Sequence, residues 1–171
     1  MRCWLLMGLL TLANASPAAG QICHDMLKLN CPAAEFPDTA YVTVYIRNCD
    51  VAVDAFGFEL LYQDEHLRFV RADRTHTLVE DWIKADAALV PSDTNSRIRV
   101  GGYDLVGVAP GDERPLIRLL FLVITPFPFD SALVFDDASL TDDIVDFQLL
   151  GCVVPVPVDG RTWGAVKAMY E

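Results

Sequence analysis

The chain has 171 residues, of which 13 are basic and 24 acidic, so that its net charge is −11. This length is enough for one domain with a substantial hydrophobic core. The excess of negative charge makes nucleic acid and anionic membrane surfaces poor partners, because like charges repel.

The first twenty residues differ in composition from the rest of the chain. Arg2 is followed by the short apolar run Trp4–Leu12, and small residues allow cleavage after either Ala15 or Gly20. This pattern predicts a secretory signal peptide, and Pro17 argues against the alternative of an N-terminal core helix. We therefore expect a secreted, extracellular protein, with the bacterial cell surface included as a location. No later segment is apolar over the length that a membrane span requires.

Four cysteines would remain after such a cleavage: Cys23, Cys31, Cys49 and Cys152. They contain no C-x-x-C spacing, and only Cys23 has a histidine beside it, so two disulfides are favoured over a zinc site. Four cysteines allow three pairings. We favour Cys23–Cys31, which would close a short N-terminal loop, together with Cys49–Cys152, which would join an early loop to the end of the last strand.

The N-terminal part of the chain predicts two strands. Met26–Leu29 is expected to be short and to lie within an irregular segment that contains two prolines. Thr39–Arg47 alternates between two sets of side chains and is rich in β-branched and aromatic residues, which favour strands.

The stretch Asp54–Val70 predicts a β-hairpin around which the other strands pack. Apolar or aromatic residues occupy every second position of its first arm: Phe56, Phe58, Leu60 and Tyr62. The residues between them would face the other way: Gly57, Glu59 and Leu61. Gln63–Glu65 supplies a polar turn, and Leu67 and Phe69 resume the alternation on the second arm.

The second half of the chain predicts five further strands, separated by turn signals. They are expected at Trp82–Leu89, Ile98–Tyr103, Pro115–Ile124, Ser131–Phe135 and Ile144–Leu150. Asp73–Glu80 and Val106–Arg114 are expected to be loops. Pro115–Ile124 is apolar almost throughout and should therefore be a central strand.

Frequent turns and no convincing long helix predict an all-β fold, a nine-stranded antiparallel β-sandwich. Residues 1–20 are expected to be the signal peptide and residues 21–152 the sandwich domain. Residues 153–171 are expected to form a Pro-containing spacer, in which Thr162 is suited to cap a short C-terminal helix at Trp163–Tyr170.

Four stretches follow one another in a distinctive order. Ala55–Tyr62 with Leu67–Val70 is similar to A-F-x-F-x-L-x-Y-D-P-x-x-L-x-F-V, and Ile98–Asp104 is similar to R-V/I-G-G-Y/F. Pro110–Gly111 with Leu116–Phe121 is similar to G-x-L-x-x-I/L-x-F. In this order the motifs resemble those of the cohesin family.

The resemblance covers roughly Asp38–Cys152 and implies a jelly-roll sandwich, related in fold to some carbohydrate-binding modules. It also implies non-catalytic binding of a dockerin or a similar protein module at one sheet face. In cellulosomal type I cohesins a polar residue on the third strand contacts the dockerin, and Gly57 stands at that position here. The turn Gln63–Glu65 also lacks the family's proline. The family's contact residues are therefore not carried over to this chain.

Motifs of catalysis are absent from the sequence. No H-E-x-x-H, G-x-S-x-G or phosphate-binding loop occurs, and the three histidines fall in different expected loops. We expect no enzymatic activity and no cofactor. The acidic stretch Asp136–Asp146 carries the oxygen ligands that Ca²⁺ prefers, but a solvated acidic loop is the favoured interpretation, and no metal site is assigned.

The sequence as a whole predicts a binding module that recognises a dockerin-like or other extracellular protein, in a setting such as a polysaccharide-degrading assembly. Direct carbohydrate binding and a structural or adhesive role are the alternatives. Three or more coplanar exposed aromatic rings would favour sugar, and a flat polar and aliphatic face would favour protein. The aromatic residues with core spacing are expected inside: Tyr41, Tyr45, Phe56, Phe58 and Phe69.

The candidate binding face is the outward set of the central strand, Gly57, Glu59 and Leu61. A partner would bury Leu61 and would offer a basic group to Glu59. The strands at Trp82–Leu89 and Ile98–Tyr103 are expected to flank this strand. The alternative is that the face is plain solvated surface.

Overall fold

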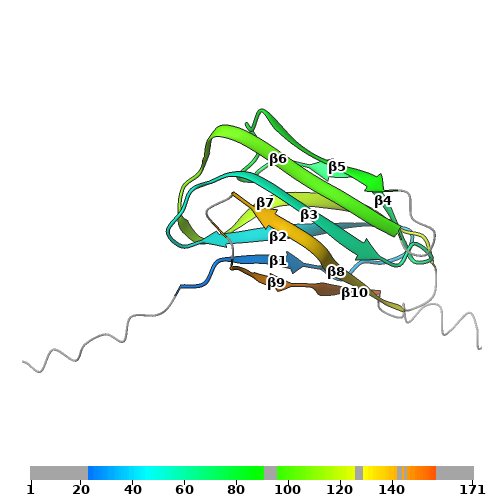
Figure 1. The fold of residues 1–171 in the computed structure, drawn as a ribbon. Helices are drawn as coiled ribbons and strands as arrows, with labels where there is room; N and C mark the ends of the chain where they lie inside the picture. Colours follow the sequence, from blue (N-terminus) through cyan, green and yellow to red (C-terminus); the bar gives the residue numbers. More distant parts are fainter. Residues whose placement is uncertain (1–22, 91–95, 126–128, 142–143, 145, 157–171) are drawn as a thin grey trace, which may run out of the picture.

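The computed structural model describes residues 23–90, 96–125, 129–141, 144 and 146–156, which form a sandwich of two five-stranded β-sheets (Figure 1). The predicted all-β fold is confirmed, with ten strands in the described residues rather than nine. Among the described residues, no helix is both long and apolar enough to cross a membrane.

The first sheet has the order β4 (Leu67–Asp73), β7 (Gly111–Val123), β2 (Thr39–Asn48), β1 (Met26–Asn30) and β9 (Gln148–Leu150). Its neighbouring strands are antiparallel except β1 and β9, which run parallel. The sequence had predicted a sandwich that is antiparallel throughout, and the β1–β9 pair shows that this was wrong. The two parallel strands are far apart in the chain, so no tight hairpin forces them to run in opposite directions.

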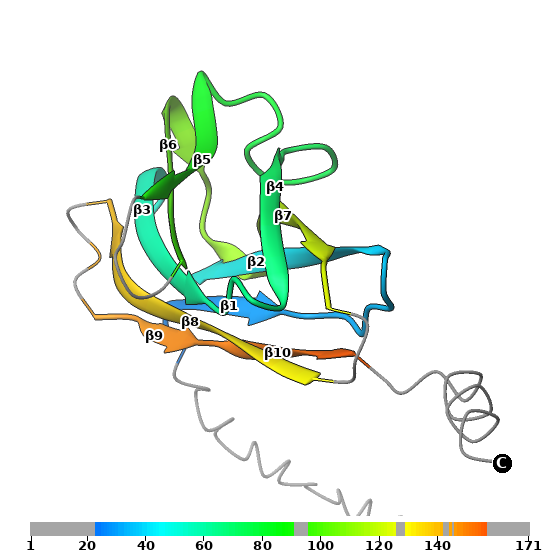
Figure 2. The ribbon, with the colours of Figure 1, turned by 90° about the vertical axis from the view of Figure 1, so that its right-hand side faces the viewer.

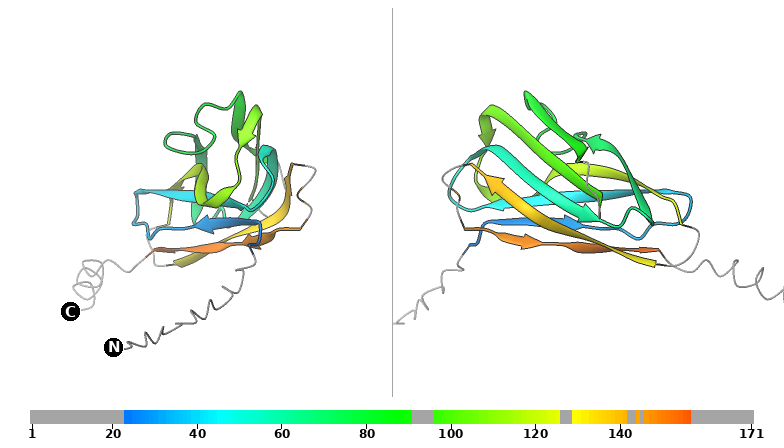
Figure 3. Two further views of the ribbon diagram at one scale, coloured as in Figure 1. Left: turned by 90° about the vertical axis from the view of Figure 1, so that its left-hand side faces the viewer. Right: turned by 45° about the vertical axis from the view of Figure 1, so that its right-hand side comes forward.

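The second sheet has the order β10 (Cys152–Val156), β8 (Phe129–Leu140), β3 (Val53–Tyr62), β6 (Ser96–Val108) and β5 (Lys84–Val90). All of its pairs are antiparallel. Figures 2 and 3 show the sheets stacked, with β3, β6 and β8 on one side and β1, β2 and β7 on the other. The outer strands β4 and β5 lie at the same margin of the sandwich.

The predicted central hairpin at Asp54–Val70 is wrong as a hairpin, although its inward and outward faces are correct. Its alternating apolar residues are buried: Phe56, Phe58, Leu60, Tyr62, Leu67 and Phe69. However, β3 pairs with β6 and β8, whereas β4 pairs with β7 in the other sheet. The turn at Gln63–His66 therefore carries the chain across the sandwich. The rings of Tyr62 and Phe69 both pack against that of Phe121, with centroid distances of 5.3 and 5.7 Å respectively.

Two expected element boundaries in the middle of the chain also differ. The segment Val106–Arg114 is not a loop, because β6 runs to Val108 and β7 begins at Gly111. Trp82 precedes β5 instead of belonging to it, and its buried ring packs 5.5 Å from that of Phe56. The expectation for the apolar strand Pro115–Ile124 is confirmed, since β7 lies inside its sheet, between β4 and β2.

Near the C-terminus, β8 extends beyond the expected Ser131–Phe135 and includes the acidic pair at positions 136–137. The last expected strand, Ile144–Leu150, is reduced to the three residues of β9. Strand β10 continues to Val156, four residues past the expected domain boundary at Cys152. The expected signal peptide and the C-terminal helix lie outside the described residues, and the jelly-roll topology stays a prediction.

The core fills the space between the two sheets. Each long strand contributes its alternating apolar residues, and the largest fully buried side chains include Ile46, Leu60, Ile98, Leu116 and Phe121. Phe58 stands edge-on to Phe135 of β8, with ring centroids 5.5 Å apart. Such close burial of aromatic rings contributes both transfer energy and specific geometry.

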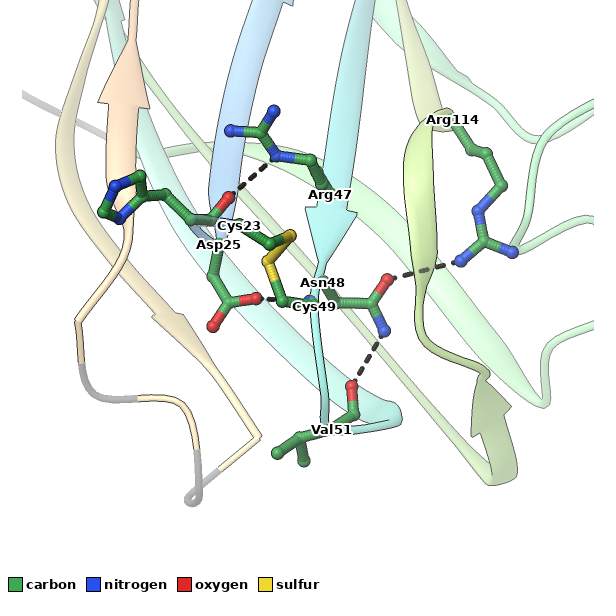
Figure 4. Close-up of a disulfide and its surroundings, with 8 residues drawn as sticks. Cys23, Asp25, Arg47, Asn48, Cys49, Val51 and Arg114 are labelled. Carbon is green, nitrogen blue, oxygen red and sulfur yellow. Dashed lines mark hydrogen bonds between the residues drawn. A yellow bond between two sulfur atoms is a disulfide. The ribbon is translucent and has the colours of Figure 1, made fainter. Parts of the chain in front are cut away.

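Two disulfides form, as predicted, but with different partners: Cys23–Cys49 and Cys31–Cys152. The favoured pairing was wrong because Cys23 and Cys31 flank β1 on opposite ends, about 26 Å apart along an extended chain. The antiparallel pairing of β1 with β2 instead brings Cys23 to Cys49, with their Cα atoms 5.8 Å apart (Figure 4). Asp25 accepts a hydrogen bond from the Cys49 amide at 2.6 Å beside this bridge.

We expect Phe58→Ala to lower the free energy of unfolding by about 3–5 kcal/mol, the range for removing a buried phenylalanine ring. Phe58 is 3% exposed. Urea melts measure the change, and Val70→Ala, at a position 49% exposed on β4, is the control. A loss below about 1 kcal/mol for Phe58→Ala would show that β3 is not central to the core.

We expect peptide mapping without reduction to find Cys23 linked to Cys49 and Cys31 linked to Cys152. The two bridges close loops with sequence separations of 26 and 121 residues. In the chain-entropy account, their removal by double Cys→Ala substitution costs about 3.5 and about 4.9 kcal/mol respectively. Recovery of the pairs Cys23–Cys31 and Cys49–Cys152 would contradict the strand register.

Candidate functional site

The outer face of β8, β3 and β6 carries the residues that the sequence had singled out. Directly paired residues of neighbouring strands share a face. The pairing therefore places three outward rows across β8, β3 and β6, in that order: Ser139, Gly57 and Gly101; Asp137, Glu59 and Arg99; Val134, Leu61 and Arg97. Gly57, Glu59 and Leu61 thus lie in successive rows on one face of the central strand.

The first of these rows has almost no side chains. We call Ser139, Gly57 and Gly101 the glycine trough. Three shallow depressions, with volumes of 370, 530 and 610 Å³, each include one or more of these residues in their lining. A row without side chains lets the backbone of another molecule approach the sheet closely. The trough is therefore suited to an extended or helical segment that crosses the strands.

Glu59 is neutralised within the sheet. Its Oε1 accepts hydrogen bonds from Nε and Nη2 of Arg99 at 2.8 and 2.5 Å, and its Oε2 accepts one from Nη1 of Arg97 at 2.8 Å. The hydrogen bond from Arg99 is the main cause that holds the pKa of Glu59 below its usual value of 4.5, with Arg97 adding to it. The expectation that a partner would supply the basic group for Glu59 was therefore wrong, because Arg97 and Arg99 already do so.

The exposed charges of this face are those of Arg99, whose side chain is 68% exposed, and of Asp136 and Asp137, whereas the side chain of Glu59 is only 13% exposed. Arg97 also pairs with Asp136, with Nη2 2.8 Å from Oδ2. The four side chains form one chain of ion pairs across β6, β3 and β8. A carboxylate held in this way orients both guanidinium groups.

The flanking strands of β3 are only partly those expected. β6 is one neighbour, as predicted, but β5 pairs with β6 and not with β3. The other neighbour is β8, whose first half was expected as a strand at Ser131–Phe135 but not beside β3. Asp136 and Asp137 are instead outward residues of a strand, and both are exposed.

The acidic stretch does not supply a metal site in the part of the chain that the structure describes. No group of three or more His, Cys, Asp or Glu residues there is arranged to hold a metal ion. Asp136 is engaged by Arg97, and Asp142 and Asp143 lie outside the described residues.

Aromatic residues are distributed differently from the expectation. Phe56, Phe58 and Phe69 are buried as predicted, but Tyr41 is 40% exposed and Tyr45 is half-buried. The two tyrosines lie on the outer face of the first sheet, because the inward set of β2 is Val42, Val44 and Ile46. Tyr103 is 51% exposed on β6. Among the described strand residues, neither outer face carries three exposed aromatic rings.

Comparison with solved structures identifies the fold. A non-cellulosomal cohesin from Archaeoglobus fulgidus is 16% identical, with a TM-score of 0.61 over 84% of this chain and 98% of that one. The cohesin CaCohA2 from Clostridium acetobutylicum is 17% identical, with a TM-score of 0.58 over 80% and 93% of the two chains.

A third similar structure is a type I cohesin–dockerin complex from Clostridium thermocellum, Coh-OlpA with Doc918, at 12% identity. Its TM-score is 0.61, and the alignment covers 79% of this chain and 100% of that one. No family model and no curated protein matches the sequence. The described residues thus have a cohesin-like fold, in agreement with the order of motifs in the sequence.

We expect the Glu59 network to make stability depend on acidic pH. Because the pKa of Glu59 is lowered in the folded state, its contribution is present above the usual value of 4.5 and is lost as the pH falls through the folded pKa. Urea melts between neutral and strongly acidic pH should show a smaller loss for Glu59→Gln than for the wild type. Glu113→Gln, in the ion pair with Lys28 on the other sheet, is the control. Equal acid sensitivity of wild type and Glu59→Gln would contradict the assignment.

Proposed function

We propose that this protein is a secreted, non-catalytic binding module that holds a dockerin-like or other extracellular protein on the outer face of β8, β3 and β6. The glycine trough carries this proposal, because it is a row across three strands in which a partner's backbone meets no side chain larger than serine. The cohesin-like fold supports the assignment to a protein-binding class.

The surroundings of the trough also suit a protein partner. On one side lies the chain of ion pairs centred on Glu59, whose arginines are oriented before any partner arrives. Beyond it lie the aliphatic side chains of Leu61 and Val134, the latter 46% exposed. A polar cluster beside an aliphatic patch is the usual composition of a protein interface. Arg99 would meet an acidic group of the partner.

The trough also indicates how this module would differ from type I cohesins. The sequence resemblance implies a polar contact residue at the position of Gly57. A glycine cannot make that contact, so the partner would gain affinity from close packing rather than from a hydrogen bond at this position. Direct sugar binding has less support, because the exposed rings on the described strands, Tyr41 and Tyr103, lie on opposite outer faces of the sandwich.

We expect Gly57→Arg to abolish partner binding while the domain stays folded. A Cβ atom at Gly57 would meet only the Ser139 hydroxyl, at 3.3 Å, and this side chain can rotate. The long arginine would then fill the trough. Wild-type and variant domains serve as baits for proteins secreted by the source organism and for a panel of dockerin modules and polysaccharides. Thr43→Arg, on the outer face of β2 in the other sheet, is the matched control.

Leu61→Arg provides an independent substitution on the same face and should give the same loss. Glu59→Lys, by contrast, would place three cations together and should destabilise the face itself rather than only slow association. If a partner still binds the Gly57→Arg and Leu61→Arg variants but no longer binds the Thr43→Arg variant, the binding site lies on the opposite sheet. Unfolding by Leu61→Arg would show that this side of β3 belongs to the core.

A further inference from the structure

Two adjacent apolar side chains on β6 are almost completely exposed. Leu105 is 87% and Val106 is 84% exposed, more than any other large apolar residue in the described part of the chain. Burying such side chains is worth roughly 1.5–3 kcal/mol each, so their exposure is unfavourable unless another molecule covers them.

The local fold holds this pair away from the core. Between the pairs Ala55–Tyr103 and Val53–Val108, β3 has one residue and β6 has four. β6 therefore has three residues more than the ladder can pair, and Asp104 to Gly107 form a bulged excursion. Because Val53 and Val108 are buried and fill the interior beneath it, the excursion projects outward.

The excursion is also anchored firmly. Gly107 has a φ of +72°, and a Cβ atom there would lie 2.8 Å from the carbonyl oxygen of Val53. The Asn48 amide, fully buried, donates hydrogen bonds to the carbonyls of Val51 and Val108, at 2.8 and 3.2 Å. Figure 4 shows Asn48 beside the Cys23–Cys49 disulfide, with Arg114 donating to its Oδ1. The two exposed residues are thus presented from a rigid base.

A complementary apolar depression lies beside the excursion. Its volume is 530 Å³, and its small apolar lining residues come from three strands: Ala55, Ala87, Ala88, Gly101 and Gly102. Tyr103, two residues before Leu105, forms one wall. The same chain therefore carries an apolar projection and, next to it, a hollow with an apolar floor.

We propose that two copies of this chain form a two-fold symmetric dimer, in which Leu105 and Val106 of each copy occupy the depression of the other. A projection beside a hollow is self-complementary under a two-fold rotation, which places both contacts in one interface. This inference does not depend on the proposed function. It accounts for two exposed apolar residues that the expected docking face does not use.

The charges around the depression favour a second copy over a strongly charged partner. The charged residues that line the depression are Lys84, Arg99 and Asp86, and Arg99 is paired with Glu59, so these four charges balance. The rim therefore adds little repulsion when two copies meet. Because the whole chain has a net charge of −11, contact between two copies is opposed least at a surface without net charge.

Sedimentation velocity of the purified secreted chain over a range of concentrations tests the proposal. We expect a reversible monomer–dimer equilibrium that strengthens between about 0.01 and about 1 M salt, because the Debye length falls from about 30 to about 3 Å and screens the repulsion of the acidic copies. Leu105→Asp combined with Val106→Asp should weaken the dimer by about tenfold or more. Unchanged urea midpoints confirm that this double variant is folded.

Three further samples distinguish the symmetric contact from non-specific association. Val153→Asp, at a 46% exposed position on β10 across the same sheet, should leave the dimer unchanged. Ala55→Gln with Ala88→Gln should fill the depression and weaken the dimer. Mixing this variant with the Leu105/Val106 variant leaves one intact contact, so the mixture should associate more strongly than either variant alone.

A wild-type chain that stays monomeric at all accessible concentrations and salt levels would overturn the proposal. A dimer that persists in the Leu105/Val106 double variant, or one that Val153→Asp removes, would also overturn it. Higher oligomers that grow with concentration would indicate head-to-tail contact and contradict two-fold symmetry.

Discussion

Burial of one apolar face from each long strand in a single interior decides which side chains remain available for function. In β3 the interior takes Phe56, Phe58, Leu60 and Tyr62, and this leaves Gly57, Glu59 and Leu61 outside. A shift of one residue would exchange the two sets, which the size of the buried aromatic rings forbids. The outer face is therefore determined by the core, although no outer residue contributes much to it. The outer face can therefore carry the glycine trough, because small residues there do not change the packing of the core.

The second constraint lies at the end of the sandwich where β2 and β6 finish. The Cys23–Cys49 disulfide, the Asp25 carboxylate and the buried Asn48 amide tie β1, β2, β3 and β6 together there. This anchoring lets β6 carry three residues more than β3 here without loss of order on either side. The depression that would receive Leu105 and Val106 is lined in part by Gly101 of the trough and by Arg99, so the dimer would cover one end of the proposed docking face and would compete with a partner there.

Much of the fold follows from the sequence, because residue periodicity reports which face of a strand is buried. The outward position of Gly57, Glu59 and Leu61 and the interior position of β7 were both predictable in this way. Periodicity does not report which strand lies alongside, so the hairpin at β3 and β4 was wrong and the turn between them crosses the sandwich. The disulfide pairing depends on the same information, since it follows from which strand ends meet. The partners of Glu59 were also hidden, because Arg97 and Arg99 lie 38 and 40 residues away and only the register of β3 with β6 brings them together. The order of four motifs predicted the cohesin-like fold, which no single element could have done.

Site-specific photo-cross-linking can test directly whether a partner docks on the trough face of β8, β3 and β6. A photoreactive phenylalanine derivative replaces Leu61 in one sample and Thr43, on the opposite outer face, in another. Each is irradiated with the proteins secreted by the source organism, and adducts are identified by mass spectrometry. We expect one defined adduct from position 61, which is lost when Gly57→Arg is added, and no adduct of the same protein from position 43. The same adduct from position 43, or an adduct from position 61 that survives Gly57→Arg, would contradict this expectation.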